Sequence, residues 1–151
     1  MKIIEKVVAY ITRETGHKAQ LLVFDHEKPH SEAGTQVPAG TVDANEDKPA
    51  ALLREVREES GLDRLEIKGK ICEYTFFRPI HHCFNRRHCY HLVPVSALPE
   101  TWVHTVSGNG IDKDMSFRYY WIYLEQAGKR LSARYGDPVG LLVSKIKEKS
   151  R

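Results

Sequence analysis

The most constraining feature of this chain lies between residues 40 and 62, where three glutamates fall on one side of a short helix. Glu55, Glu58 and Glu59 are spaced i, i+3 and i+4, so they occupy an arc of about 100° on an α-helix. Like charges at these spacings repel one another, and a bound cation would remove that repulsion. Mg²⁺ takes oxygen ligands from carboxylates and from substrate phosphates. The stretch therefore indicates a helix whose acidic side binds a divalent cation.

The expected ends of this helix are marked by residues that favour helix termini. Asp47 is the expected N-cap, and Pro49 lies in the first turn, where its missing N–H is harmless. Gly61 suits the left-handed position that ends a helix, followed by an apolar contact from Leu62. We therefore expect a helix of about three to four turns between Asp47 and Gly61.

The orientation of the helix is predicted from its remaining side chains. Ala50, Leu53, Val56 and Ser60 form the less polar side, which is expected to pack on the core. The glutamates would then face outward. Just upstream, residues 38–40 (Pro-Ala-Gly) predict a tight turn whose backbone approaches the same ion.

The same residues resemble the signature of the Nudix hydrolase family. The box of that family is a glycine, five residues, Glu, seven residues, Arg-Glu, an aliphatic residue, any residue, Glu-Glu, any residue, Gly and an aliphatic residue. The chain matches it without departure at Gly40, Glu46, Arg54, Glu55, Val56, Glu58, Glu59, Gly61 and Leu62. The resemblance implies an α+β Nudix fold, in which a mixed β-sheet is sandwiched between α-helices (α/β/α).

The resemblance also implies roles for the residues of the box. Glu59 would be a metal ligand, and Glu55 and Glu58 would share metal ligation and general-base catalysis. Arg54 would orient one of these acids. The implied cofactor is Mg²⁺, for which Mn²⁺ can substitute.

Three further residues take supporting roles by the same resemblance. A backbone carbonyl of Ala39 or Gly40 would complete the metal coordination. Glu46 would be a structural partner near the start of the helix. Many family members have glycine where this chain has Ala39, a change that leaves the carbonyl in place.

The rest of the chain alternates β-prone segments with turns and ends in an amphipathic helix. Residues 26–34 and the basic segment 78–88 predict loops, and residues 97–116 predict an irregular lid or edge segment. Gly69 predicts a β-bulge. The expected strands are residues 2–13, 19–25, 35–37, 65–78, 89–95 and 117–124, and the expected closing helix is residues 138–147.

Candidate substrate-binding residues lie outside the box. Arg78, Arg86 and Arg87 could bind phosphate oxygens, or they could keep a hairpin tip soluble. Phe77 and Tyr119 are the candidates for stacking on a nucleobase, although strand aromatics more often pack in the core.

Two possible metal positions outside the box complete the set. Glu125 could be an extra metal ligand or an ordinary surface residue. The histidines and cysteines between residues 81 and 91 have no common zinc spacing, so zinc is not expected there.

Composition narrows the class of protein. The chain has 151 residues, which suits one domain spanning residues 1–151. A balance of 23 basic and 20 acidic residues, a net charge of +3, does not indicate a general nucleic-acid binder. The three cysteines show no disulfide framework, and neither a signal peptide nor a membrane span is evident, so we expect a cytoplasmic protein.

Together these features predict a pyrophosphohydrolase acting on a nucleoside diphosphate linked to another group, with nucleoside di- and triphosphates as the main candidates. Alternative substrates are dinucleoside polyphosphates, ADP-ribose and the triphosphorylated 5′ end of RNA, the one nucleic acid considered. A catalytically silent nucleotide-binding module is the alternative from another class. A homodimer is a possible assembly, since relatives are often dimers.

Overall fold

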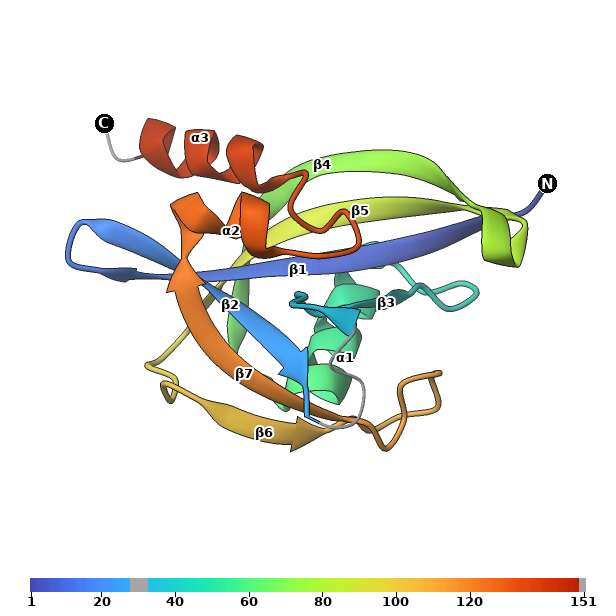
Figure 1. The fold of residues 1–151 in the computed structure, drawn as a ribbon, viewed down its shortest axis with the longest axis horizontal. Helices are drawn as coiled ribbons and strands as arrows, with labels where there is room; N and C mark the ends of the chain where they lie inside the picture. Colours follow the sequence, from blue (N-terminus) through green and yellow to red (C-terminus); the bar gives the residue numbers. More distant parts are fainter. Residues whose placement is uncertain (28–32, 150–151) are drawn as a thin grey trace.

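The structure is a computed structural model that describes residues 1–27 and 33–149. Within them, seven strands form one mixed sheet, and helix α1 lies on the opposite side from α2 and α3 (Figure 1). The strand order is β4-β5-β1-β2-β7-β6, and β3 pairs with part of β1. The elements in chain order are β1 (Ile3–Thr15), β2 (Lys18–His26), β3 (Ala39–Thr41), α1 (Lys48–Ser60), β4 (Leu65–Arg78), a 3₁₀ turn η2 (Pro79–His81), β5 (Cys83–Pro94), β6 (Trp102–Thr105), β7 (Ser116–Tyr123), α2 (Leu124–Arg130) and α3 (Val139–Lys149).

Strand β1 joins the two halves of the sheet. On one edge it pairs in parallel with β5, from Ile3 opposite Phe84 to Ile11 opposite Leu92. On the other edge its first half pairs with β3 and its last residues pair with the hairpin partner β2. Side chains of β1 can therefore reach groups on β5 as well as on β3.

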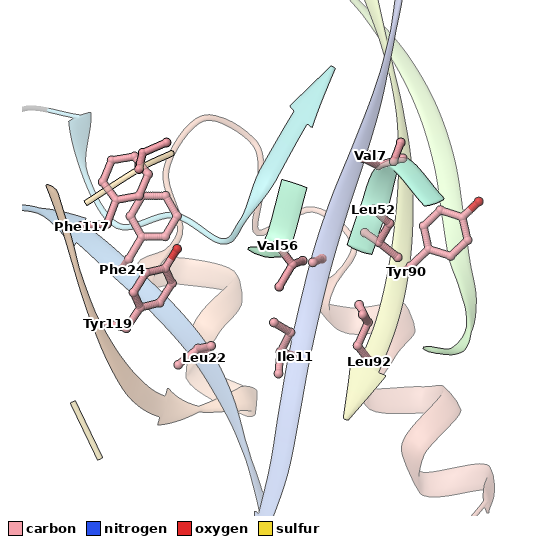
Figure 2. Close-up of a cluster of buried hydrophobic side chains, with 13 residues drawn as sticks. Val7, Ile11, Leu22, Phe24, Leu52, Val56, Tyr90, Leu92, Phe117 and Tyr119 are labelled. Atoms are coloured by element: carbon pink, nitrogen blue, oxygen red, sulfur yellow. The ribbon is translucent and has the colours of Figure 1, made fainter. Parts of the chain in front are cut away.

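The sheet is buried on both faces. Alternate residues of β1, such as Val7 and Ile11, pack toward α1, where Leu52 and Val56 meet them (Figure 2). The intervening residues, such as Tyr10, pack under α2 and α3. Burial on both faces explains the continuously apolar sequence of β2, and it confirms the predicted α/β/α sandwich.

The predicted ends of α1 are confirmed. The Asp47 side chain accepts a hydrogen bond from the backbone N–H of Ala50 at 2.7 Å. Gly61 adopts φ 81° in the left-handed region, and its N–H donates to the carbonyl of Arg57 at 2.9 Å. Local residue chemistry thus fixes where this helix begins and ends.

The predicted orientation of α1 is partly wrong. Ala50 is exposed and Leu53 is 39% exposed, whereas Ala51 and Leu52 are buried. Glu59 is also buried, at 5% exposure, so not all the acids face outward. The reason is that α1 packs its acidic side against β3 and the loop after β6, in addition to packing its apolar side on the sheet.

Several other predicted boundaries need correction. Thr35 and Gln36 make only isolated β-bridges. Ala39 and Gly40, predicted as a turn, begin β3, because they pair with Val8 and Val7 of β1. In the predicted loop 26–34, residues 28–32, and with them Pro29, lie outside the described residues.

The basic segment 78–88 is mostly strand. Arg78 ends β4, a short 3₁₀ turn follows, and β5 begins at Cys83, before the predicted residue 89. The parallel pairing of β5 with β1 extends to its first residues and holds this polar segment extended. Arg86 and Arg87 therefore point to opposite faces of a strand.

The segments at the end of the chain are mostly as predicted. A register shift at Gly69 confirms the bulge in β4. The irregular segment 97–116 contains the edge strand β6, and helix α2 was missed. The closing helix α3 is confirmed. Among the described residues, no helix is long and apolar enough to cross a membrane.

Candidate active site

A cavity of about 450 Å³ lies beside the acidic side of α1. Five carboxylates line it: Glu55, Glu58 and Glu59 from α1, Asp43 from the segment after β3, and Asp112 from the loop between β6 and β7. The opposite side carries Lys6 of β1, Arg78 of β4 and Arg87 of β5, which together form a cationic wall. The cavity thus has one acidic side and one basic side.

Arg54 holds three of the glutamates around α1. Its Nε and Nη2 donate to the two oxygens of Glu46 at 2.8 and 2.9 Å. Its Nη1 donates to Glu55 at 2.9 Å and to both oxygens of Glu58 at 3.2 Å. The guanidinium also reaches the carbonyl of Thr41 on β3 at 3.0 Å. One arginine therefore supplies the counter-charge of the acids and ties the helix to the sheet.

The paired guanidinium changes the ionisation of Glu46. The hydrogen bonds from Arg54, with a further one from the backbone N–H of Asp43, lower the pKa of Glu46 to about 2. The carboxylate therefore stays ionised at any physiological pH, and Arg54 keeps a fixed partner whatever Glu55 and Glu58 bind.

The acids nearest the sheet are perturbed in the opposite direction. Burial raises the pKa of Glu59 well above its usual value. A hydrogen bond of 3.1 Å from the N–H of Ala39 lowers this pKa, and repulsion from neighbouring acids, including Asp112, raises it. Burial also raises the pKa of Glu55. These buried, mutually repelling carboxylates are an environment that a cation would stabilise.

The last turn of α1 is held by side chains of the second half of the sheet. The hydroxyl of Tyr119 donates to the carbonyl of Glu59 at 2.9 Å, and the indole N–H of Trp102 donates to that of Ser60 at 3.0 Å. The N–H of Ser107 donates to the carbonyl of Glu58 at 3.0 Å. Carbonyls at a helix end have no partner within the helix, so these donors satisfy them and fix the turn that carries the acids.

Two glycines allow backbone to lie directly against the acids. A Cβ at Gly40 would overlap the carboxylate of Glu55, and a Cβ at Gly108 would overlap that of Glu58. Gly108 also has φ 89°, which other residues rarely adopt. The first residue of the box is therefore glycine because a carboxylate occupies the space of its side chain.

Comparison with models of known protein families assigns the chain to one of them. The NUDIX domain model matches residues 3–139. The chain belongs to the Nudix family. It is accordingly a hydrolase of phosphoanhydride bonds, and the stretch from Gly40 to Leu62 is its Nudix box.

Solved structures of other proteins share this Nudix fold at low sequence identity. The ORF135 protein of E. coli is 21% identical with a TM-score of 0.65, over 95% of this chain and 91% of that one. Ap4A hydrolase of C. elegans is 21% identical with a TM-score of 0.63, over 95% and 98%. A MutT protein of Methanosarcina mazei Go1 is 19% identical with a TM-score of 0.65, over 97% and 96%. Comparison with curated protein sequences found no significant match.

The Nudix acids offer the donor set of a hard divalent cation. No group of three or more His, Cys, Asp or Glu side chains within residues 1–27 and 33–149 is arranged as a ready metal site, and Arg54 holds oxygens of Glu55 and Glu58. The fit rests on the concentration of buried carboxylate oxygens in one cavity and on the carbonyl-bearing strand residues Ala39 and Gly40 that line it. Metal binding would require the Nη1 contacts of Arg54 to open, while Glu46 keeps the rest of the guanidinium in place.

Four of the predicted site residues lie elsewhere. Arg86 bonds to Glu5 at 3.0 Å and does not line the cavity. Phe77 packs edge-on against Phe84 outside the cavity. Tyr119 is fully buried and supports α1, so it is not exposed for base stacking. Glu125 lies on α2, is 73% exposed and faces Lys147 at 3.7 Å. Of the predicted arginines, Arg78 and Arg87 do line the cavity.

The cavity also contains residues that the sequence analysis did not single out: Lys6, Asn85, Asp112 and Tyr135. Lys6 is a single cation that interrupts an apolar strand, and this interruption was the available signal. Burial lowers the pKa of Lys6, attraction to Glu55 raises it, and repulsion from Arg78 and Arg87 lowers it further. Asn85 is brought to the site by the parallel pairing of β5 with β1, and Asp112 and Tyr135 lie in loops, after β6 and after α2, whose approach to the cavity sequence spacing does not reveal.

Proposed function

We propose that this Nudix hydrolase is a Mg²⁺-dependent pyrophosphohydrolase that acts on nucleoside di- or triphosphates and releases a nucleoside monophosphate. The observation that supports it most directly is the cavity that the carboxylates of α1 share with the cationic wall of Lys6, Arg78 and Arg87. Carboxylates suit a divalent cation, and cations suit the phosphate oxygens of a substrate. Mn²⁺ is expected to substitute for Mg²⁺.

Under this proposal the box residues divide the work. Glu59 binds the cation together with a backbone carbonyl of Ala39 or Gly40, and Glu55 and Glu58 share ligation with removal of a proton from the attacking water. When bound, the cation supplies charge neutralisation on phosphate oxygens and a more acidic water. Arg54 stays anchored to Glu46 and orients the acid that it contacts.

A substrate panel tests this proposal. The purified chain would be assayed with Mg²⁺ against nucleoside di- and triphosphates, with Ap4A, ADP-ribose and triphosphorylated RNA included. Ap4A is included because one structurally similar protein is an Ap4A hydrolase, and ADP-ribose because the similar NUDIX domain of Shewanella oneidensis NrtR was crystallised with it. Released phosphate, pyrophosphate and nucleoside monophosphate would be measured. We expect turnover that disappears on chelation and is greatest with a free nucleotide.

Variants test the assigned residues. Glu59→Gln is expected to lower kcat by at least about 100-fold, the usual range for loss of a catalytic acid or base or of charge stabilisation. Glu125→Gln, which removes an equal charge on α2, is the matched control and should leave turnover unchanged. Nucleotide binding without product for every substrate would instead identify a silent binding module.

A further inference from the structure

The two arginines of the cationic wall carry positive charge for which the described residues provide no ion-pair partner. Arg87 is only 4% exposed, and its Nη1 donates to two neutral groups, the hydroxyl of Tyr74 at 3.0 Å and the carbonyl of Ala133 at 2.8 Å. Its guanidinium lies over the ring of Tyr135, 4.0 Å from the centroid. Within the part of the chain that the structure describes, neither Arg78 nor Arg87 has an ion-pair partner. A buried charge without a counter-charge is costly, so this arrangement indicates an anion that arrives from outside.

The neighbouring arginine shows that this lack of pairing is specific to the cavity. Arg86 lies on the opposite face of the same strand, and Glu5 receives its Nη1 at 3.0 Å. His88, on the same face as Arg86, also contacts Glu5, at 2.7 Å. The chain therefore supplies a carboxylate to the cation that faces away from the cavity and supplies none to the cation that faces into it.

Asn85 provides an independent sign of a ligand. It is 4% exposed, lies on the same face of β5 as Arg87 and lines the cavity. Its amide makes no hydrogen bond to any residue described. The residue is buried as a whole, but its amide atoms are not among the fully buried unsatisfied atoms, so they open into the cavity, where a bound molecule can take up their hydrogen bonds.

Within the wall, Lys6 lies next to the box acids, since its Nζ donates to Thr41 Oγ1 at 2.7 Å and Glu55 attracts it, whereas the two arginines lie on strands farther from β3. Thr41 of β3, Lys6 of β1 and Arg87 of β5 are directly opposite one another in three adjacent strands. Two strand spacings separate β3, beside the acids, from β5, which is roughly 10 Å. Lys6 therefore lies between the acids and the two arginines, and a substrate with phosphates at both places would pass along it.

We propose that Lys6, Arg78, Arg87 and Asn85 form a second phosphate subsite, which binds a phosphate group of the substrate beyond the phosphoanhydride bond held at the acids. This inference rests on the proposed function, and it narrows the substrate class to nucleotides that carry such an additional phosphate. The additional group has two chemical sources: a longer 5′-phosphate chain or a phosphomonoester on the ribose. Both present the same oxygens to the arginine forks.

A substrate series separates these sources. Steady-state kinetics would compare a nucleoside 5′-diphosphate with the 5′-triphosphate, the 5′-tetraphosphate and the 3′-phosphate 5′-diphosphate of the same nucleoside. We expect KM to fall by at least tenfold when the additional phosphate is present. The tri- and tetraphosphate arms report the chain, and the 3′-phosphate arm reports the ribose. A KM that is independent of every additional phosphate would overturn the proposal.

Variants show whether the wall causes the effect. Arg78→Gln, at a partly exposed position, should raise KM for the preferred substrate about tenfold more than it raises KM for the diphosphate, with a smaller effect on kcat. Arg86→Gln also removes one positive charge, from the face of β5 that points away from the cavity. It should change neither KM nor kcat. Equal effects of Arg78→Gln on all substrates would count against the subsite.

A binding measurement separates failure of the subsite from failure of the proposed function. Calorimetry would compare inorganic tripolyphosphate with pyrophosphate on the wild type, Arg78→Gln and Arg87→Lys, with folding checked by thermal unfolding. We expect tighter binding of tripolyphosphate, lost in Arg78→Gln and weakened in Arg87→Lys. If no nucleotide is hydrolysed but this pattern holds, only the proposed function fails. If nucleotides are hydrolysed and the two polyphosphates bind equally well to all three proteins, only the subsite fails.

Discussion

The hydroxyl of Tyr119 is expected to stabilise both the fold and the position of Glu59. Tyr119 is fully buried and its hydroxyl donates to the carbonyl of Glu59. Tyr119→Phe would leave that carbonyl without a donor and without access to water. An unsatisfied buried polar group costs about 1–3 kcal/mol, so we expect the free energy of unfolding to fall by about 2 kcal/mol. For a chain of this size the unfolding temperature should fall by roughly 4–8 °C.

A neighbouring tyrosine provides the matched control. Tyr120 lies on the same strand, and its hydroxyl donates to Asp25 at 2.9 Å in a half-buried position where water can replace it. Tyr120→Phe should therefore cost only about 0.5–1 kcal/mol. Urea unfolding of both variants measures the difference. Equal destabilisation, or a smaller loss for Tyr119→Phe, would refute the argument from burial.

The same variant should affect catalysis. Without the hydrogen bond from Tyr119, the last turn of α1 can shift, and Glu59 shifts with it. Misplacement of about 1 Å can cost up to about 100-fold in rate, so we expect kcat to fall by roughly tenfold while KM changes little. Full activity in a destabilised Tyr119→Phe protein would show that Glu59 is positioned by other contacts.

Three further predictions concern the box and its cation. Gly40→Ala should lower turnover at least tenfold because its Cβ would displace the Glu55 carboxylate, whereas Gly140→Ala, which meets no neighbour in α3, should leave turnover unchanged. The pKa of Glu46 is lowered by Arg54, so its stabilisation is complete above the ordinary value of 4.5 and is lost as pH falls through about 2. The unfolding temperature of the wild type should accordingly fall more steeply across this range than that of Glu46→Gln. Mg²⁺ at 100 times its Kd should increase the free energy of unfolding by about 2.7 kcal/mol. A chelator should reverse this stabilisation, and the stabilisation should be much smaller in Glu55→Gln.

The ends of α1 could be predicted from the sequence, but its orientation could not. Asp47 and Gly61 act through contacts within a few residues, so the residue types alone specify them. The orientation depends on Glu59, a carboxylate in the buried stripe next to Leu52. Carboxylates are rarely buried, so hydrophobic patterning placed all three acids outside. Patterning rules are violated most often at functional sites, and the buried Glu59 lies in the candidate active site.

The basic side of the cavity was predicted only in part, for a related reason. The run from Asn85 to His88 has the composition of an exposed loop, and the sequence gives no sign that it forms a strand beside β1. Only the parallel pairing, which joins segments far apart in the chain, turns Asn85 and Arg87 into the cavity and Arg86 away from it. Lys6 is placed by the pairings of β1 with β3 and β5, and Asp112 by the loop between β6 and β7.

The double use of β1 has a consequence for biosynthesis. This strand is synthesised before β5, so Ile3 must wait for Phe84 before its parallel partner exists. Until then β1 can pair only with β2 and β3, and its other edge stays open to other chains. Helix α1 can fold locally before β5 is made, whereas Arg87, which lies on β5, cannot yet line the cavity. A chain stalled before β5 would therefore carry the acids and Lys6 without Arg87, and it would be prone to aggregate along the open edge of β1.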